Sequence, residues 1–384
     1  MFPPQLSRPF YIVILLTAVF LEVGSAQLFA QQPERILYIR GEFSDSAMPI
    51  SESVWSQRLT DINAFGQTYY QRDSYGTISE FQGTLTPVFR LPEASTGYQG
   101  GSNVHKLNSH MRSLASNAGF NLSQYDQVVL SYPGVLNQPF GAAALPGTVW
   151  LPGSNPWGPG FVHEMGHAFG VGHASSIEAG DQVFPGEHRE GRDGLHMLGS
   201  EDGRLAPTNL YMKLRMGFVG NEYFQTATEN GVHRIYAYDE ATLPNSSDNK
   251  LGTFFNVDGL QFLVSYGPGM AEIWDDFGGE VWSRGVMVHQ TLNSITRLLD
   301  FTPGSQGEGN TEDYWDTRDG ALTLGNTFQF PNSDFLIQPL ETGTGVDGRR
   351  YINVRFQLTP IPEPGHAVGL AALSLALIGR RRRL

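Results

Sequence analysis

The most informative stretch of this chain is His163-Glu164-Met165-Gly166-His167-Ala168-Phe169-Gly170-Val171-Gly172-His173. On a helix, His163 and His167 lie four residues apart, so both imidazoles project from one face. That spacing suits two ligands of one zinc ion. Gly170 lets the chain turn sharply after the helix, because glycine readily adopts positive φ, and His173 can then return as a third ligand. The stretch therefore predicts a helix that ends at a metal site with three histidines.

The residue after the first histidine adds the chemistry. Three neutral imidazoles leave zinc with its full charge and an open coordination position. Glu164 can reach water at that position without binding the metal itself, and can act as the general base while zinc polarises a substrate carbonyl. A helix that merely carries surface histidines is the alternative, and a five-residue His-Glu-x-x-His match would leave it open. The longer pattern argues against it, so the residues predict hydrolysis with Glu164 as the catalytic residue.

This pattern resembles the signature of the metzincin zinc peptidases, in which three histidines bind zinc and the glutamate is the base. The resemblance implies a further methionine, on a tight turn beneath the zinc ligands. Met197, within Leu195-His196-Met197-Leu198-Gly199, is the candidate for this Met-turn. Met212 and Met216 are its rivals, but their neighbours have a helical pattern. A methionine can also simply fill a hydrophobic core.

Further motifs flank the site in a fixed order. Residues 35–43 with Ser44-Asp45, then Asn63-Ala64-Phe65 and Ser74-Tyr75-Gly76, precede the zinc helix, and residues 196–199 and 214–218 follow it. This order looks like the gametolysin-type branch of the metzincins, which cleaves extracellular proteins. The resemblance covers roughly residues 33–220, and later fragments look like the family's trailing β region. One position departs from the pattern: some metzincins carry a tyrosine two residues after the methionine, where this chain has Gly199. The resemblance thus implies a zinc metalloendopeptidase that acts on proteins or peptides and has no fourth protein ligand.

Two other interpretations stay open. The chain could be a non-catalytic cell-surface or matrix protein that retains a structural zinc site. The intact Glu164 argues against this interpretation, because a structural site has no need of it. It could also be a zinc hydrolase that acts on another bond, such as a cell-wall link.

The segment before the zinc helix, residues 141–151, is rich in small residues. In metzincins the corresponding segment supplies an edge strand that pairs with the main chain of an extended substrate. An ordinary loop of glycine and proline residues explains the same composition equally well.

Hydrophobic patterning predicts an α+β fold. Residues 33–132 alternate between β-type runs and apolar residues at helical spacing, which indicates strand, helix, strand, helix, strand. After residue 225, short β-type runs alternate with turn residues, and we expect no helix there. We therefore predict a metzincin-like zinc peptidase domain over residues 33–222, with a twisted sheet, helices and the zinc helix. An all-β, sandwich-like domain follows over residues 225–360.

Both ends of the chain have the pattern of sorting signals. Residues 1–26 combine Arg8, an apolar run too short for a membrane span, and small residues, which is typical of a cleaved signal peptide. Residues 361–384 combine Pro-Glu-Pro, an apolar run and four arginines. This order closely resembles the PEP-CTERM sorting signal of exopolysaccharide-producing Gram-negative bacteria; a plain membrane anchor is the alternative. The resemblance implies export to the cell surface or extracellular matrix, exosortase-type sorting machinery as a partner, and only transient membrane contact.

Composition narrows the possible functions. The 384 residues contain no cysteine, which excludes disulfides, thiol catalysis and zinc sites built on cysteine. Acidic residues (38) outnumber basic ones (25), and the net charge of −13 disfavours a nucleic-acid partner.

Other titratable residues give weaker indications. His188 and His196 lie between the third ligand and the methionine, and we expect solvated loop residues rather than a second metal site or a substrate contact. Four further histidines show no ligand spacing: His105, His110, His233 and His289. An acidic cluster makes Ca²⁺ a second candidate cofactor, although a solvated loop is the simpler interpretation. Its members are Glu308, Glu312, Asp313, Asp316 and Asp319.

Overall fold

The computed structural model describes residues 31–100, 103–134, 143–153, 158–199, 205–275, 279–305 and 313–358. They belong to one compact unit that begins at Gln31. The expected signal peptide (1–26) and sorting tail (361–384) lie outside the described residues. In the part of the chain that is described, no helix has both the length and the apolar character of a membrane span.

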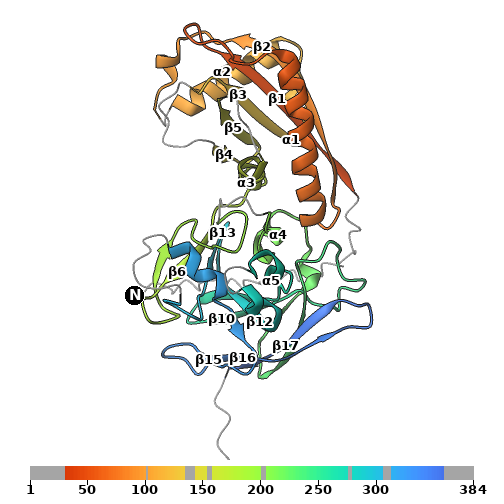
Figure 1. The fold of residues 1–384 in the computed structure, drawn as a ribbon, viewed down its shortest axis with the longest axis vertical. Helices are drawn as coiled ribbons and strands as arrows, with labels where there is room; N and C mark the ends of the chain where they lie inside the picture. The colour runs from red at the N-terminus through yellow and green to blue at the C-terminus, as the bar shows by residue number, and fades with distance from the viewer. Residues whose placement is uncertain are drawn as a thin grey trace, which may run out of the picture. The chain divides into compact units, whose positions relative to one another are not determined.

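The first part of the chain contains a five-stranded sheet with the strand order β2-β1-β3-β5-β4 (Figure 1). Its strands are β1 (Gln32–Glu42), β2 (Ile78–Arg90), β3 (Gln127–Tyr132), β4 (Ala143–Leu145) and β5 (Thr148–Pro152). All neighbouring pairs are parallel except β4 and β5, which are antiparallel. The edge strand β4 therefore runs against the rest of the sheet.

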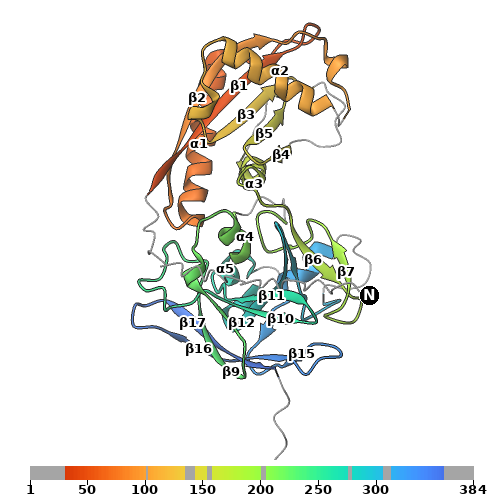
Figure 2. The ribbon, with the colours of Figure 1, turned by 180° about the vertical axis from the view of Figure 1, so that it is seen from behind.

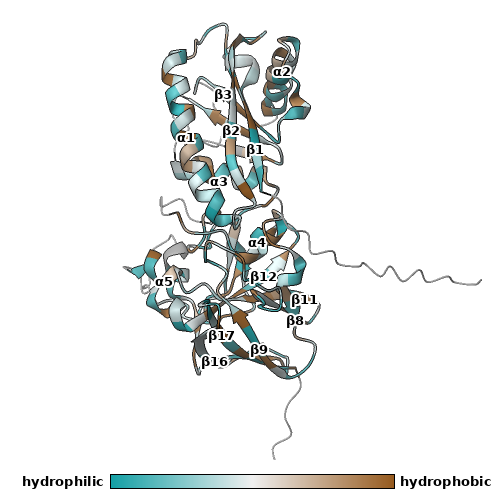
Figure 3. Cartoon of the chain, turned by 90° about the vertical axis from the view of Figure 1, so that its right-hand side faces the viewer, coloured by the Kyte–Doolittle hydropathy of each residue, from teal (hydrophilic) through white to brown (hydrophobic). Residues whose placement is uncertain are grey.

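Helices cover both faces of this sheet. Alternate residues of a strand face opposite sides, so Ile36 and Tyr38 of β1 pack with α1 (Glu52–Asp73) and α3 (Gly158–Ala168). Leu37 and Ile39 pack instead with α2 (Val104–Asn117). The buried strands carry the hydrophobic residues between these helices, as Figure 3 shows. The predicted alternation of strands and helices over residues 33–132 matches these elements.

Two further sheets follow α3. The eight-stranded sheet has the order β7-β6-β13-β12-β11-β10-β8, with β14 beside β12. Figure 2 labels β6, β7, β10, β11 and β12 of this sheet. Its strands are β6 (Ala174–Glu178), β7 (Glu187–Arg189), β8 (Phe224–Thr226), β10 (Gly252–Val257), β11 (Leu260–Ser265), β12 (Gly285–Leu292), β13 (Ile295–Leu298) and β14 (Leu322–Thr323). The four-stranded sheet contains β9 (Gly231–Tyr236), β15 (Phe328–Gln329), β16 (Leu336–Thr344) and β17 (Arg350–Gln357).

The two later sheets share one hydrophobic core. Phe255 and Phe262 of the eight-stranded sheet pack in the same buried cluster as Ile352 and Phe356 of the four-stranded sheet. Phe255 also stacks on Phe335, with ring centroids 4.6 Å apart. This face-to-face packing is the arrangement of a sandwich.

One strand pairing crosses the domain boundary that the sequence predicts. β6 follows the third histidine of the motif and pairs in parallel with β13, through Ala174 opposite Thr296. The eight-stranded sheet therefore draws strands from both sides of residues 222–225.

Short helices complete the mixed α+β fold. α4 (Leu210–Arg215) coincides with the helical sequence pattern around Met212. The expectation of no helix after residue 225 is wrong for α5 (Met270–Ile273), a single turn too short to show periodicity. The 3₁₀ segments are η1 (Ser95–Tyr98), η3 (Leu122–Gln124), η4 (Asn221–Tyr223), η6 (Gly279–Arg284) and η7 (Asp313–Asp319).

Candidate metal centre

The structure brings the three histidines of the motif together. His163 and His167 occupy the C-terminal half of α3, and their Nε2 atoms lie 3.2 Å apart. After the helix the chain reverses at Gly170, whose φ of +97° is strained for a residue with a side chain. His173 thereby returns toward α3, with ring centroids 5.4 Å from His163 and 4.6 Å from His167. One ligand atom from each of the three residues falls within a common 4.8 Å.

Each of these imidazoles is oriented by a partner at its other nitrogen. Nδ1 of His163 lies 3.0 Å from the carbonyl oxygen of Met197, and Nδ1 of His167 lies 2.9 Å from that of Val171. Nδ1 of His173 lies 3.1 Å from Oε1 of Glu190. Because carbonyl and carboxylate oxygens accept hydrogen bonds, each Nδ1 carries the proton and each Nε2 is free to bind a metal.

The geometry fits zinc. A tetrahedral zinc ion with bonds of about 2.0–2.1 Å to nitrogen places neighbouring ligand atoms about 3.3 Å apart. The Nε2 atoms of His163 and His167 already stand at that spacing. Burial lowers the pKa of His163 to about 4, with nearby His167 adding to the effect, and burial also lowers the pKa of His167. Both rings are therefore neutral near pH 7, as metal ligands must be.

Glu190 was missed by the sequence analysis. Its carboxylate is the partner of His173, and that hydrogen bond holds the pKa of Glu190 below its ordinary value. Carboxylate–histidine–metal arrangements of this kind are common in zinc proteins. Nothing in the sequence distinguishes Glu190 from other loop carboxylates, because its pairing depends on how the loop folds back.

Glu164 lies on α3, the helix that carries His163 and His167. It follows His163 directly and is 9% exposed. The helix is held from behind by Tyr70, whose hydroxyl donates a 2.6 Å hydrogen bond to the carbonyl oxygen of Val162. The role of Glu164 as general base stays a prediction.

Met197 occupies a turn that contacts the histidine site. The amide of Gly199 donates to the carbonyl oxygen of His196, which closes the turn. Met197 is 2% exposed and packs in the same hydrophobic cluster as Val162 and Met165 of α3. Its rival Met212 lies instead on α4.

Gly199 has a structural reason for lacking a side chain. A Cβ atom at this position would stand 2.1 Å from the carbonyl oxygen of Asp193 and 2.7 Å from that of Ala174. No larger residue fits, so the departure from the metzincin pattern at this position follows from close backbone packing.

Other histidines take different positions. The expectation that His196 is a solvated loop residue is wrong, because it is fully buried. His289 is also buried, on β12. His188 is partly buried, and its Nδ1 accepts a 2.8 Å hydrogen bond from Arg297. Of the other histidines named as lacking ligand spacing, His105 is exposed, while His110 and His233 are partly buried.

The described part of residues 141–151 forms a hairpin. β4 and β5 flank a turn at residues 146–147, and β4 is the free edge of the sheet. The amide of Gly147 donates to the carbonyl oxygen of Ala168, the last residue of α3. The hairpin is therefore tied to the helix that carries the histidines.

The acidic cluster is only partly described, since residues 306–312 lie outside the described ranges. Asp316 and Asp319 accept hydrogen bonds from Ser305, and both approach the buried Asp300. Burial, with the nearby carboxylates, raises the pKa of Asp300 to about 8. Among described residues the groups that converge like metal ligands are two histidine-containing clusters, and this one is not among them. Calcium here stays a prediction.

The solved structures that resemble this chain share little sequence with it. No family model matches the chain, and no curated protein matches it. Crystal structures of wild-type OgpA from Akkermansia muciniphila align with 11% identity over 62% of this chain and 71% of that chain (TM-score 0.34), and with 10% identity over 85% and 92% (TM-score 0.35). A catalytically inactive OgpA in complex with an O-glycopeptide, glycodrosocin, aligns with 10% identity over 84% and 92% (TM-score 0.32).

Proposed function

We propose that this chain is a zinc-dependent metalloendopeptidase that hydrolyses peptide bonds with an activated water molecule. The observation that carries the proposal is the convergence of His163, His167 and His173, each with its Nδ1 engaged by an oxygen acceptor. Such an arrangement presents three Nε2 atoms to one ion and leaves a fourth position open.

In this hydrolysis, the zinc ion and the side chains of the protein have different roles. Zinc, when bound, supplies the Lewis acidity that activates water and polarises the substrate carbonyl. Glu164 accepts the proton of the attacking water and returns it to the leaving amine. The free edge of β4 pairs with the main chain of an extended substrate, which favours peptides over compact ligands. Met197 forms the apolar floor under the histidines.

We also propose a peptidase family and a location for this protein. The eleven-residue motif and the Met-turn candidate support a metzincin, and the order of the surrounding motifs supports its gametolysin-type branch. The terminal sequence patterns support export of the protein to the cell surface or extracellular matrix through a signal peptide and a PEP-CTERM tail. Protein substrates in that compartment would then be its targets.

A non-catalytic protein with a structural zinc site is the second candidate. The two are separated by metal analysis of the purified chain and by its digestion of casein and of a proteome-derived peptide library. We expect one zinc per chain, and activity that Glu164→Ala abolishes while metal binding persists. The matched control is Glu187→Ala, an exposed carboxylate on β7. A wild-type chain that binds zinc without cleaving peptides, or equal activity in Glu164→Ala, would contradict the peptidase.

A further inference from the structure

Residues 193–199, which we call the Met-turn loop, set the position of one zinc-ligand candidate. His163 donates its Nδ1–H to the carbonyl oxygen of Met197. The direction in which Nε2 of His163 points therefore depends on where that carbonyl lies. Whatever fixes the loop also fixes this imidazole.

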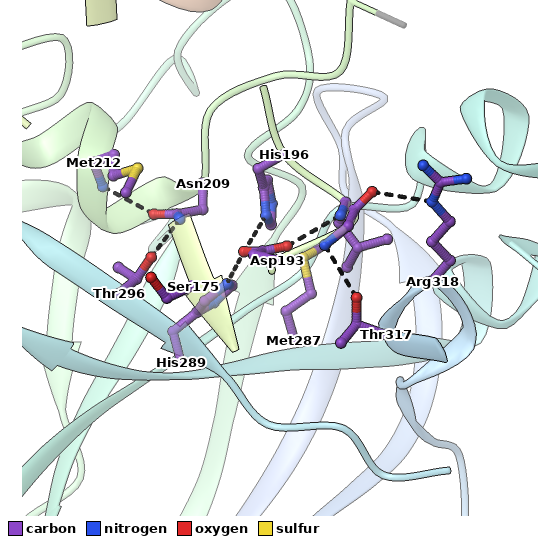
Figure 4. A network of polar contacts seen from close by, with 12 residues as sticks. Ser175, Asp193, His196, Asn209, Met212, Met287, His289, Thr296, Thr317 and Arg318 are labelled. Atoms are coloured by element: carbon purple, nitrogen blue, oxygen red, sulfur yellow. Dashed lines mark hydrogen bonds and ion pairs between the residues drawn. The ribbon is translucent and has the colours of Figure 1, made fainter. Parts of the chain in front are cut away.

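A buried carboxylate organises the loop from within (Figure 4). Oδ1 of Asp193 accepts the amide of Leu195 at 3.1 Å, and Oδ2 lies 2.7 Å from Nδ1 of His196. The same Oδ2 lies 3.2 Å from Nε2 of His289 on β12. Nε2 of His196 in turn lies 2.9 Å from the hydroxyl of Tyr238. Both histidines and Asp193 are at most 1% exposed, so water does not compete for these hydrogen bonds.

The charge state of Asp193 suits this role. Burial by itself would raise the pKa of Asp193, but the hydrogen bonds and charges of His196 and His289 hold it well below its ordinary value. The group is a carboxylate, which accepts hydrogen bonds from both rings and donates none.

Backbone hydrogen bonds connect the loop to the residue after the third histidine. The amide of Asp193 donates to the carbonyl oxygen of Ala174, and the amide of Ala174 donates to that of Leu198 at 3.0 Å. The loop is also held at Gly194, whose amide donates to Oγ1 of Thr317 and whose carbonyl oxygen accepts from Arg318 (Figure 4). Segments far apart in the chain thus converge on one short loop.

The same three side chains could suggest a second metal site, since their ligand atoms lie within 4.8 Å of one another. The distances favour hydrogen bonds. Nδ1 of His196 stands 2.7 Å from the Asp193 carboxylate, whereas two ligands of a tetrahedral zinc ion would be about 3.3 Å apart. The second nitrogen of His196 is also occupied, by Tyr238.

We propose that Asp193, with His196 and His289, forms a positioning network that holds the Met-turn loop so that the Met197 carbonyl orients His163 for zinc. The inference rests on the proposed zinc site and adds the residues that preorganise it. None of the three touches the substrate or the metal; they act through Met197.

The test compares zinc affinity and kinetics in matched variants of the full chain. Asp193→Asn replaces the acceptor carboxylate by a group that donates from one side. His289→Gln keeps an N–H donor toward Asp193, whereas His289→Leu removes it. A control for lost stability is Ile352→Ala, in the core between the two later sheets. Zinc affinity is measured by competition with a chromogenic chelator, the site geometry by the visible spectrum of the Co²⁺-substituted protein, and turnover by kcat and KM on one peptide.

We expect Asp193→Asn and His289→Leu to bind zinc about 10- to 100-fold more weakly than Ile352→Ala, compared at equal melting temperature. Loss of groups that orient metal ligands typically weakens metal binding by this factor. Their Co²⁺ spectra should change and kcat should fall more than KM rises, while His289→Gln recovers most of the affinity. If Asp193→Asn does not fold, the two His289 variants alone decide.

Three results would overturn the network. Affinities and spectra equal to those of the control would show a purely structural role, with the proposed function intact. Two zinc ions in wild type, one of them lost in Asp193→Asn, would make the cluster a metal site. A wild-type chain that binds no zinc would remove the proposed function and this inference together.

Discussion

Nδ1 of His163 lies 3.0 Å from the carbonyl oxygen of Met197, a residue 34 positions later in the chain. The motif helix and the Met-turn loop are therefore one structural unit, joined at the first histidine. A methionine in this turn matters through its main chain as well as its side chain. Changes in the loop should then be visible in metal binding before they are visible in substrate binding.

Glu190→Gln should weaken zinc binding through His173. The glutamine keeps a side-chain oxygen that can accept the Nδ1–H but loses the charge that makes the imidazole more basic. Glu190 is largely exposed, so we expect an effect near the lower end of the roughly 10- to 100-fold range for such partners. Chelator competition measures it. Asp181→Asn, another exposed loop carboxylate, serves as the control and should bind zinc like wild type; equal weakening in both variants would argue against a specific pairing.

Gly199→Ala should distort the Met-turn loop. The added Cβ would meet the carbonyl oxygens of Asp193 and Ala174, and the Ala174 carbonyl cannot move without breaking the hydrogen bond that it accepts from the amide of Asp193. Overpacking typically costs about 1–3 kcal/mol, and a backbone clash belongs at the upper end. Urea denaturation gives the free energy of unfolding, and chelator competition gives the zinc affinity; both should fall. Gly160→Ala is the comparison, because a Cβ there meets no atom within 4 Å. Unchanged zinc affinity in Gly199→Ala would contradict the coupling between loop and site.

Asp300→Asn should stabilise the chain at alkaline pH. Burial raises the pKa of Asp300 to about 8, above the ordinary value of 3.8, so the native state keeps a proton that the unfolded state releases. Stability contributed by this proton is complete below about pH 4 and is lost as the pH rises through 8. Asparagine imitates the protonated acid, so its gain in melting temperature over wild type should grow between pH 5 and pH 9.

Calcium would reverse the outcome of that experiment. If Asp300, Asp316 and Asp319 bind Ca²⁺, the ion should raise the melting temperature of wild type at pH 8, and Asp300→Asn should lose that rise. Thermal scans with Ca²⁺ and with a calcium chelator distinguish the two cases. Burial of Asp300 and its side-chain hydrogen bond with Asp316 favour the protonated, calcium-free interpretation.

Removal of one partner of the buried Asp73–Lys213 pair should be strongly destabilising. Nζ of Lys213 lies 2.6 Å from Oδ1 of Asp73, both residues are 1% exposed, and Thr208 also donates to this carboxylate. An uncompensated buried charge costs about 3–5 kcal/mol. Lys213→Met should lower the free energy of unfolding by about that amount in a urea titration, and Asp73→Asn combined with Lys213→Met should recover part of it. A single variant as stable as wild type would show that the pair is not desolvated.

Much of the local structure could be predicted because it depends on neighbours in the chain. The spacing of apolar residues gave α1 and α2, and alternation of strands and helices gave the first sheet. The His163–His167 spacing and the glycine at position 170 were sufficient to predict that the three histidines lie close together. α5 was missed because one helical turn has no period to detect. The burial of His196 was missed because a loop residue becomes buried only through what packs over it.

The sequence by itself determined the helix that carries two histidines, the sharp turn at Gly170 and the β-rich character of the later chain. These follow from side-chain periodicity and from the conformational freedom of glycine, which act over a few residues. Only the tertiary structure decided that Met197 and Glu190 orient the histidines, that β6 pairs with β13, and that Asp193 meets His289 across 96 residues. Such contacts form because a buried polar group must find a partner wherever the fold supplies one, and that partner has no fixed place along the chain.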